Sequence, residues 1–154
     1  MKKALTLITA LLSFGVVPAF AENPHIGTWK LNQTKTKSDP AAVTNGTATY
    51  TEGSNGMIKL AVDGTDKDGK PMHWTWEGKF DGKQQKVTGS AMMDSVAYTK
   101  VDDHTNKIEG MKDGKVVMTG TIKVAADGKS REVTTTTTDA SGKKETRTAY
   151  YDKQ

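Results

Sequence analysis

The chain contains no cysteine, few aromatic residues and only three histidines. The lack of cysteine excludes a disulfide-stapled scaffold, a thiolate metal or iron–sulfur site, a cysteine nucleophile and a lipid anchor on a processed cysteine. Hydrophobic residues make up 34% of the chain and aromatic residues 6%, so a single domain must build a thin core from few large side chains. The histidines are His25, His73 and His104, and no two of them have metal-ligand spacing. We expect neither a metal site nor a cofactor.

The common signatures of catalysis and of nucleic-acid binding are also missing. The sequence has no nucleophile elbow, no glycine-rich phosphate loop before a helix and no serine with an evident base. Its net charge of +4 is scattered along the chain, whereas a nucleic-acid partner calls for clustered Lys and Arg. The composition therefore favours a protein that binds and does not catalyse.

The first 21 residues have the organisation of a secretory signal peptide. Two lysines precede an uncharged, largely apolar stretch from Ala4 to Phe20, which ends in the small-x-small site Ala19-Phe20-Ala21. The apolar stretch is shorter than the roughly 20 residues that a membrane span needs. Cleavage after Ala21 predicts an exported mature domain of residues 22–154, periplasmic or secreted and without a membrane span.

Short turns recur along the mature chain. They share Asp or Ser before a glycine that tolerates positive φ, which is typical of β-hairpins. These turns are Lys67-Asp68-Gly69-Lys70, Phe80-Asp81-Gly82-Lys83, Lys112-Asp113-Gly114-Lys115, Ala126-Asp127-Gly128-Lys129 and Ala140-Ser141-Gly142-Lys143. The segments between turns are rich in Thr, Val, Ile, Tyr and Trp and lack helical periodicity. They predict ten strands at 26–33, 46–52, 57–63, 71–80, 84–89, 95–101, 105–112, 115–125, 130–139 and 143–152.

Alternation within the strands indicates a sheet with one apolar face. Met72, Trp74, Trp76 and Phe80 share one parity, and the residues between them are mostly polar. Strands joined by tight hairpins form a meander, and closing the meander removes both exposed edges. The expected fold is therefore all-β, a single up-and-down antiparallel β-barrel of about 8–10 strands over residues 22–154.

Two segments depart from this pattern. Gln33 to Thr44 is a longer, lysine-containing connection, which fits either a lid over a barrel mouth or a plain linker. Thr134 to Thr138 carries hydroxyls on both faces of a strand, which fits cross-strand threonine pairs or the polar lining of a cavity. The sequence leaves both pairs of alternatives open.

The first predicted strand opens with a Gly-x-Trp motif, Ile26-Gly27-Thr28-Trp29-Lys30-Leu31-Asn32. With the hairpin meander and the terminal Tyr151-Asp152-Lys153-Gln154, the chain resembles small exported bacterial lipocalin-like proteins of the calycin superfamily, of unassigned function. In lipocalins this tryptophan closes one end of the barrel, and an arginine near the last strand packs over its ring. The resemblance implies these closing roles for Gly27, Trp29 and Arg147. A role for Arg147 as anchor of a ligand carboxylate, as in fatty-acid-binding proteins, is the alternative.

Large side chains on the apolar strand faces are the candidates for a ligand site. Two indoles on one strand face either line a pocket or fill a core that has few apolar residues. The predicted ligand-binding residues are Trp74, Trp76, Tyr98, Met118 and Tyr151. They suggest a barrel that holds a small, partly hydrophobic or aromatic molecule without chemistry. The alternatives are a protein-interaction or inhibitor module with a filled barrel and, less favoured, an enzyme of the lipocalin fold.

Overall fold

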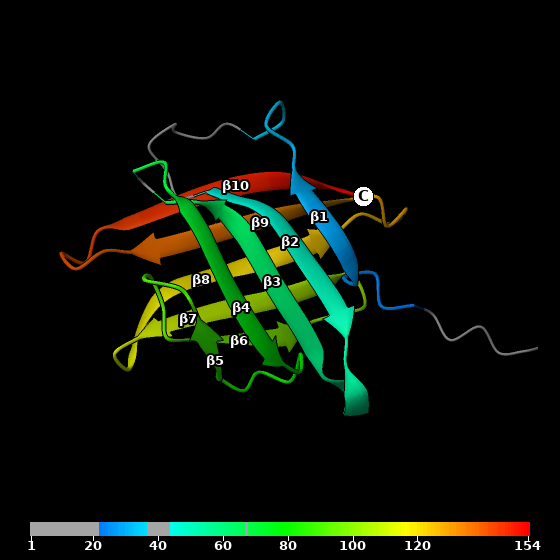
Figure 1. The fold of residues 1–154 in the computed structure, drawn as a ribbon, viewed down its shortest axis with the longest axis horizontal. Coiled ribbons are helices and arrows are strands. Elements are labelled where there is room, and N and C mark those ends of the chain that lie inside the picture. Colours follow the sequence, from blue (N-terminus) through cyan, green and yellow to red (C-terminus); the bar gives the residue numbers. More distant parts are fainter. Residues whose placement is uncertain (1–21, 37–43, 67) are drawn as a thin grey trace, which may run out of the picture.

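The computed structural model describes residues 22–36, 44–66 and 68–154 and contains ten antiparallel strands. They are β1 (Gly27–Leu31), β2 (Thr44–Glu52), β3 (Ile58–Thr65), β4 (Pro71–Gly78), β5 (Gln85–Thr88), β6 (Ser95–Lys100), β7 (Thr105–Lys112), β8 (Lys115–Val124), β9 (Ser130–Thr138) and β10 (Lys144–Lys153), with a 3-10 turn η1 (Ser54–Gly56). Each strand pairs with its sequence neighbours and β10 pairs with β1, so the sheet closes into a barrel (Figure 1). The all-β barrel fold is confirmed. The predicted signal peptide and residues 37–43 of the predicted loop lie outside the described residues.

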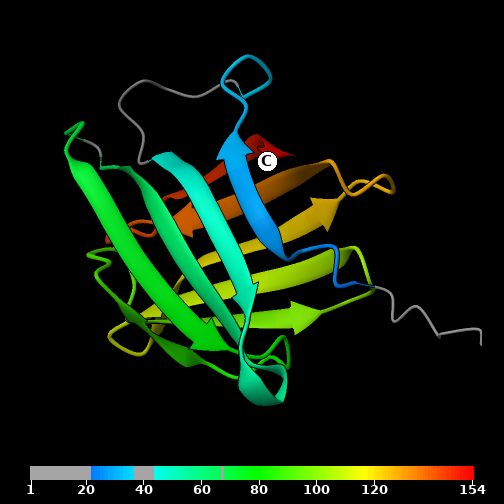
Figure 2. The same ribbon diagram turned by 45° about the vertical axis from the view of Figure 1, so that its right-hand side comes forward.

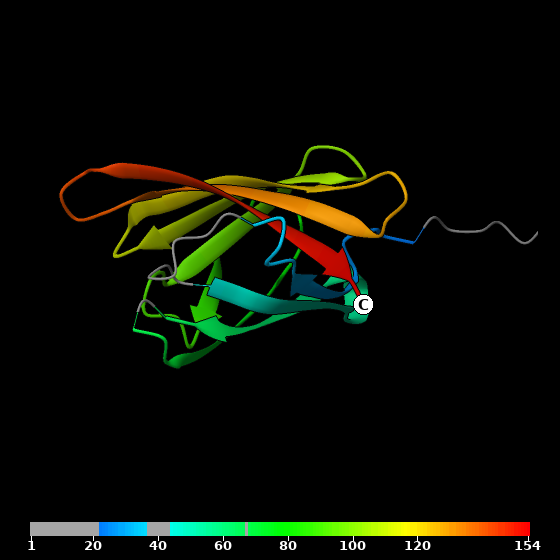
Figure 3. The same cartoon turned by 90° about the horizontal axis from the view of Figure 1, so that it is seen from above.

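The barrel is flattened into two walls whose strands cross. Strands β1 to β4 form one wall, and β7 to β10 run across behind them (Figures 1 and 2). Seen from above, the two walls lie over each other and join at the β1–β10 side (Figure 3). Alternation directs one face of each wall inward, as β4 illustrates with Trp74 and Trp76 buried and Glu77 exposed. Nothing helical in the described part of the chain has the length and apolar character to cross a membrane.

The seam between the first and last strands is closed by backbone pairing and one buried indole. Trp29 lies opposite Lys153 in the β1–β10 register and is fully buried. Its Nε1 donates a hydrogen bond to the His25 carbonyl oxygen at 2.9 Å. Gly27 has a φ of 123°, and a Cβ there would lie 2.7 Å from the Lys153 Cε. The Lys153 side chain could move aside, so it is the positive φ that favours glycine at this position.

On the opposite side, β5 is short and makes only two residue pairs with β4 and two with β6. Trp76 reinforces this side, because its Nε1 donates to the Val96 carbonyl oxygen at 2.9 Å and so joins β4 to β6. The indole ring is stacked against Phe80, with the centroids 6.5 Å apart and the planes at 18°. Trp76 therefore joins β4 to β6 on the side of the barrel where neighbouring strands share few residue pairs.

The predicted barrel-closing role of Arg147 is wrong. Arg147 pairs with Thr135 in the β9–β10 register, and its Nη2 lies 2.6 Å from the Glu145 carboxylate. Lys153, the partner of Trp29, is six residues further along β10, a distance of roughly 20 Å in an extended strand. Arg147 is thus too far from the seam to cover the indole. Arg131 on β9 occupies that place, with its Cζ 4.8 Å from the Trp29 ring centroid.

The threonine run on β9 has a different role on each face. The hydroxyl of Thr134 lies 3.0 Å from that of Thr148 on β10, and the Thr136 hydroxyl lies 2.7 Å from that of Thr146. These pairs lie on the face opposite to Arg131, since Arg131 and Thr135 share the inward parity. Thr135 instead lines the interior. Both alternatives left open by the sequence therefore apply, one to each face.

Candidate functional site

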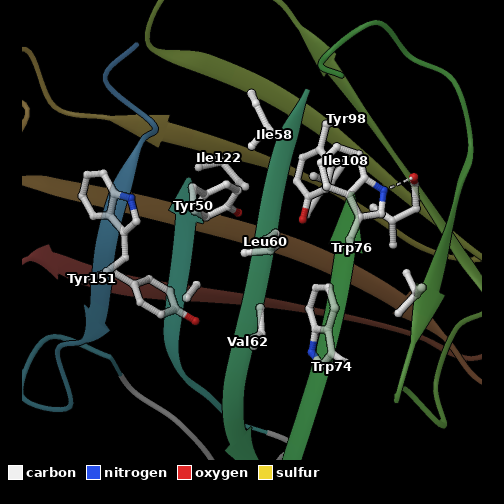
Figure 4. Packing of buried hydrophobic residues seen from close by; sticks show 14 of the residues in the cluster. Tyr50, Ile58, Leu60, Val62, Trp74, Trp76, Tyr98, Ile108, Ile122 and Tyr151 are labelled. Atoms are coloured by element: carbon white, nitrogen blue, oxygen red, sulfur yellow. Dashed lines mark hydrogen bonds between the residues drawn. The ribbon is translucent and has the colours of Figure 1, made fainter. Parts of the chain in front are cut away.

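A cavity of about 70 Å³ lies inside the barrel. Four of the five predicted ligand-binding residues line it, namely Trp74, Tyr98, Met118 and Tyr151. They reach it from four strands, and Leu60 and Val62 of β3 lie between Trp74 and Tyr151 (Figure 4). A buried water needs roughly 10–15 Å³ by this kind of measure, so the cavity has room for about five waters. Sites for drug-sized ligands measure about 300–1,000 Å³, so this cavity has room only for a small molecule or the end of a longer one.

The fifth predicted residue, Trp76, does not line this cavity. Its ring packs against Tyr98 in an edge-to-face contact with the centroids 4.7 Å apart. The hydrogen bond to Val96 holds the indole in place beside the cavity (Figure 4). Trp74 and Trp76 lie on the same face of β4, but Trp74 lines the cavity and Trp76 packs in the core.

A buried arginine also faces the cavity. Arg131 is 4% exposed, and its Cζ lies 4.8 Å, 5.1 Å and 4.8 Å from the ring centroids of Trp29, Tyr50 and Tyr151. Among the described residues, the buried Nε and Nη1 of Arg131 have no hydrogen-bond partner, and no carboxylate forms an ion pair with the guanidinium. A cation–π contact contributes about 0.5–2 kcal/mol, so the three rings offset part of the cost of burying this charge.

Sequence reasoning missed Arg131, although a signal for it was present. Arg131 stands two residues before Val133 and four before Thr135, and all three share the inward parity of β9 and line the cavity. The register places it directly opposite Tyr151, one of the predicted ligand-binding residues. Alternation with Val133 would have put this arginine on the inward face, but Arg147 has inward parity as well, so alternation alone does not distinguish the two.

The tyrosine hydroxyls at the cavity are neutral hydrogen-bonding groups. Burial raises the pKa of Tyr151 to about 12, against the lowering effect of the Arg131 charge. The Tyr151 hydroxyl donates to the Asn45 carbonyl oxygen at 2.9 Å. Burial, followed by the neighbouring Tyr50 hydroxyl, raises the pKa of Tyr98 well above its usual value. In the described part of the chain, Arg131 thus supplies the one formal charge on the cavity wall at neutral pH.

A second hollow, of about 370 Å³, lies where β1 begins, between the β6–β7 and β8–β9 turns. Its wall includes His25 and Asn106, which are 2% and 1% exposed. Burial, followed by the positive charge of Arg131, lowers the pKa of His25 to about 4, so this imidazole is neutral at neutral pH. The described residues bring no three potential metal ligands together here or elsewhere.

No family model matches the chain, and no curated protein matches its sequence. Among solved structures, the barrel is similar to the structure of EF1p2_mFAP2b bound to DFHBI, with 12% sequence identity and a TM-score of 0.47. The match covers 85% of this chain and 94% of that chain. The cavity and its side chains are therefore the basis for a functional proposal.

Proposed function

We propose that this protein binds a small, partly hydrophobic or aromatic molecule, or the compact end of a longer one, and leaves it chemically unchanged. The observation that carries the proposal is the interior cavity walled by Trp74, Tyr98, Met118 and Tyr151. Aromatic and aliphatic walls with a few placed polar groups are the usual composition of small-molecule sites. Binding fits this cavity better than catalysis, because the described residues of its wall are mostly aromatic and aliphatic and include no acid–base pair for chemistry.

The energetics of the cavity also favour an occupant. A void in a packed core costs about 24 cal/mol per Å³, so about 70 Å³ costs roughly 1–2 kcal/mol. Elsewhere in the described interior, Trp76 and Trp29 are buried and hydrogen-bonded to backbone carbonyls. An aromatic-walled space beside such packed side chains is well suited to hold a ligand.

The proposal includes export of the mature domain. It rests on the basic start, the apolar stretch and the Ala19-Phe20-Ala21 site of the leader. A periplasmic or secreted binding protein would meet small molecules directly outside the cytoplasm. Cell fractionation followed by N-terminal sequencing tests this, with Glu22 as the expected first residue of the mature chain.

A protein-interaction module with a filled barrel is the second candidate. The observation in its favour is the small cavity, well below the roughly 300 Å³ of an ordinary small-molecule pocket. In that case the loops would make the functional contacts, and the interior would serve only for stability. Ligand titration separates the two candidates.

The two tryptophans of β4 supply a matched pair of variants for that titration. The purified protein is titrated with a panel of small aromatic, isoprenoid and short acyl compounds while indole fluorescence and the indole N–H resonances are recorded. We expect a ligand to move the Trp74 resonance, and Trp74→Phe to weaken its binding at least about fivefold. Trp76→Phe should leave affinity nearly unchanged, because that ring does not face the cavity. If no compound affects Trp74, the ligand-binding proposal is wrong and the filled-barrel module is favoured. If both variants bind a compound alike, the cavity beside Trp74 is not its binding site.

A further inference from the structure

We propose that the molecule held in the barrel carries an anionic group, a carboxylate or a group of similar shape and charge, and that Arg131 binds it. This inference rests on the proposed ligand-binding function and adds to it the charge of the ligand. It starts from the buried guanidinium of Arg131, which faces the interior cavity.

Three aromatic rings surround Arg131, and two of its nitrogens have no hydrogen-bond partner among the described residues. Trp29, Tyr50 and Tyr151 lie 4.8–5.1 Å from the Cζ, as cation–π contacts require. A guanidinium donates its hydrogen bonds in its own plane, through five N–H groups. Nε and Nη1 find no hydrogen-bond partner among the described residues. The rings therefore hold the cation in place while the donors on these two nitrogens stay available.

An anion would accept hydrogen bonds from the unpaired donors of Arg131 and would also neutralise its buried charge. Buried donors cost about 1–3 kcal/mol each when unpaired, and a buried charge without a counter-charge costs several kcal/mol. Water in the cavity would accept hydrogen bonds but would leave the charge uncompensated. A carboxylate accepts charge-assisted hydrogen bonds from a guanidinium and also neutralises it. No acidic side chain of the described residues takes this place, since each ion pair found there involves another base.

The size and walls of the cavity define the rest of the ligand. About 70 Å³, room for about five water-sized groups, admits the acid group and a few attached carbons, and Trp74, Met118 and Val62 give those carbons an apolar surface. The Tyr50 ring lies beside the cation, and burial raises the pKa of Tyr98 well above its usual value, so the Tyr98 hydroxyl stays protonated. The ligand class is thus a short or branched monoacid of few carbons, or a longer molecule that ends in such a group.

Two pairs of isosteric probes test this inference on the purified protein. Propionate is compared with propionamide, and isobutyrate with isobutyramide, by NMR titration of the side-chain N–H groups. The chain has two arginines and three tryptophans, so the arginine Nε–H and indole N–H signals are few and are assigned with single variants. The matched variants are Arg131→Met and Arg147→Met, because Arg147 lies outside the cavity wall and bonds Glu145.

We expect at least one acid to bind about tenfold or more tightly than its amide and to move the Arg131 Nε–H and Trp74 indole signals. Arg131→Met should abolish this preference, and Arg147→Met should keep it. If Arg131→Met does not fold, Arg131→Lys, which keeps the charge and loses the planar fork, is expected to weaken the preference several-fold.

Three results would overturn the inference. The acid and its amide could bind equally tightly while the Trp74 indole signal shifts. That result leaves the ligand-binding function intact and shows that water alone satisfies the N–H groups of Arg131. An acid preference that survives in Arg131→Met assigns the anion to another cation. If neither pair of probes shifts Arg131 or Trp74, the anion site is wrong, and the function itself then depends on the broader titration panel.

Discussion

The β9–β10 ribbon carries both arginines of the chain, and the two have opposite surroundings. At its base, next to β1, Arg131 is buried among three aromatic rings. Toward its tip, Arg147 keeps 41% of its side chain exposed and pairs with Glu145. Both have the inward parity of their strands, because Arg131 pairs with Tyr151 and Arg147 with Thr135. Parity thus fixes the face on which a side chain lies, and position along the ribbon decides whether the opposite wall covers it.

The polar groups of the two regions differ in the same way. At the tip, hydroxyl pairs such as Thr136 with Thr146 bond each other on the outer face. At the base, the Trp29 indole and the Tyr151 hydroxyl each donate to a backbone carbonyl inside the barrel. Interactions at the base should therefore contribute more to stability than those at the tip, because the base is closed to solvent.

Substitution of Trp29 should give the largest difference between the two regions. We expect Trp29→Ala to lower the free energy of unfolding by about 3–5 kcal/mol, because a fully buried indole and its hydrogen bond to His25 are lost. Thr136→Ala at the tip should cost less than about 1 kcal/mol. Urea denaturation of both variants measures this, and equal losses would show that the base is no more tightly packed than the tip.

The pH dependence of stability should reveal the buried histidine beside the base. Because the pKa of His25 is lowered from 6.5 to about 4, the unfolded chain binds more protons than the folded one between these values. The free energy of unfolding has its full value above about pH 6.5 and falls by up to about 3 kcal/mol as the pH drops to about 4. Urea midpoints at several pH values check this.

Two variants test whether His25 causes this loss of stability at low pH. His25→Gln should flatten the slope between pH 6.5 and 4, whereas His73→Gln, at an exposed histidine, should keep it. A slope that survives in His25→Gln would assign the effect to another group.

The tyrosine at the base should show an intermediate effect. Tyr151→Phe removes the hydroxyl that donates to the Asn45 carbonyl oxygen and leaves the ring over Arg131 in place. We expect a loss of about 1 kcal/mol in unfolding free energy, typical of one internal hydrogen bond. Chemical denaturation measures it. A loss above about 3 kcal/mol would mean that the hydroxyl supports more than this single bond.

The arginine at the tip should give the smallest effect. Arg147→Gln breaks a partly exposed ion pair with Glu145, and such pairs contribute little because water and salt screen them. The unfolding free energy should change by less than about 0.5 kcal/mol. Should the loss exceed about 1.5 kcal/mol, the tip would be more tightly integrated into the barrel than its exposure indicates.

The sequence predicted the barrel and most of the cavity wall because turns and alternation are local signals. The Asp-Gly turns locate the hairpins, and the parity of β4 directs Trp74 inward. Which arginine covers Trp29 depends on the register of β10 against both β1 and β9. No local sequence pattern contains that register. Whether Trp74 or Trp76 lines the cavity depends on the short strand β5, because Trp76 reaches past that strand to bond Val96 of β6.

Native mass spectrometry of the protein, purified from its own host under mild conditions, tests most directly whether the cavity is a ligand site. The matched variant is Val133→Phe, which adds volume at the cavity wall. We predict that the wild-type chain retains a small molecule of constant mass and that the folded Val133→Phe variant does not. A wild-type chain that is always found without a bound molecule, or a variant that retains the same one, would contradict a ligand site in the barrel interior.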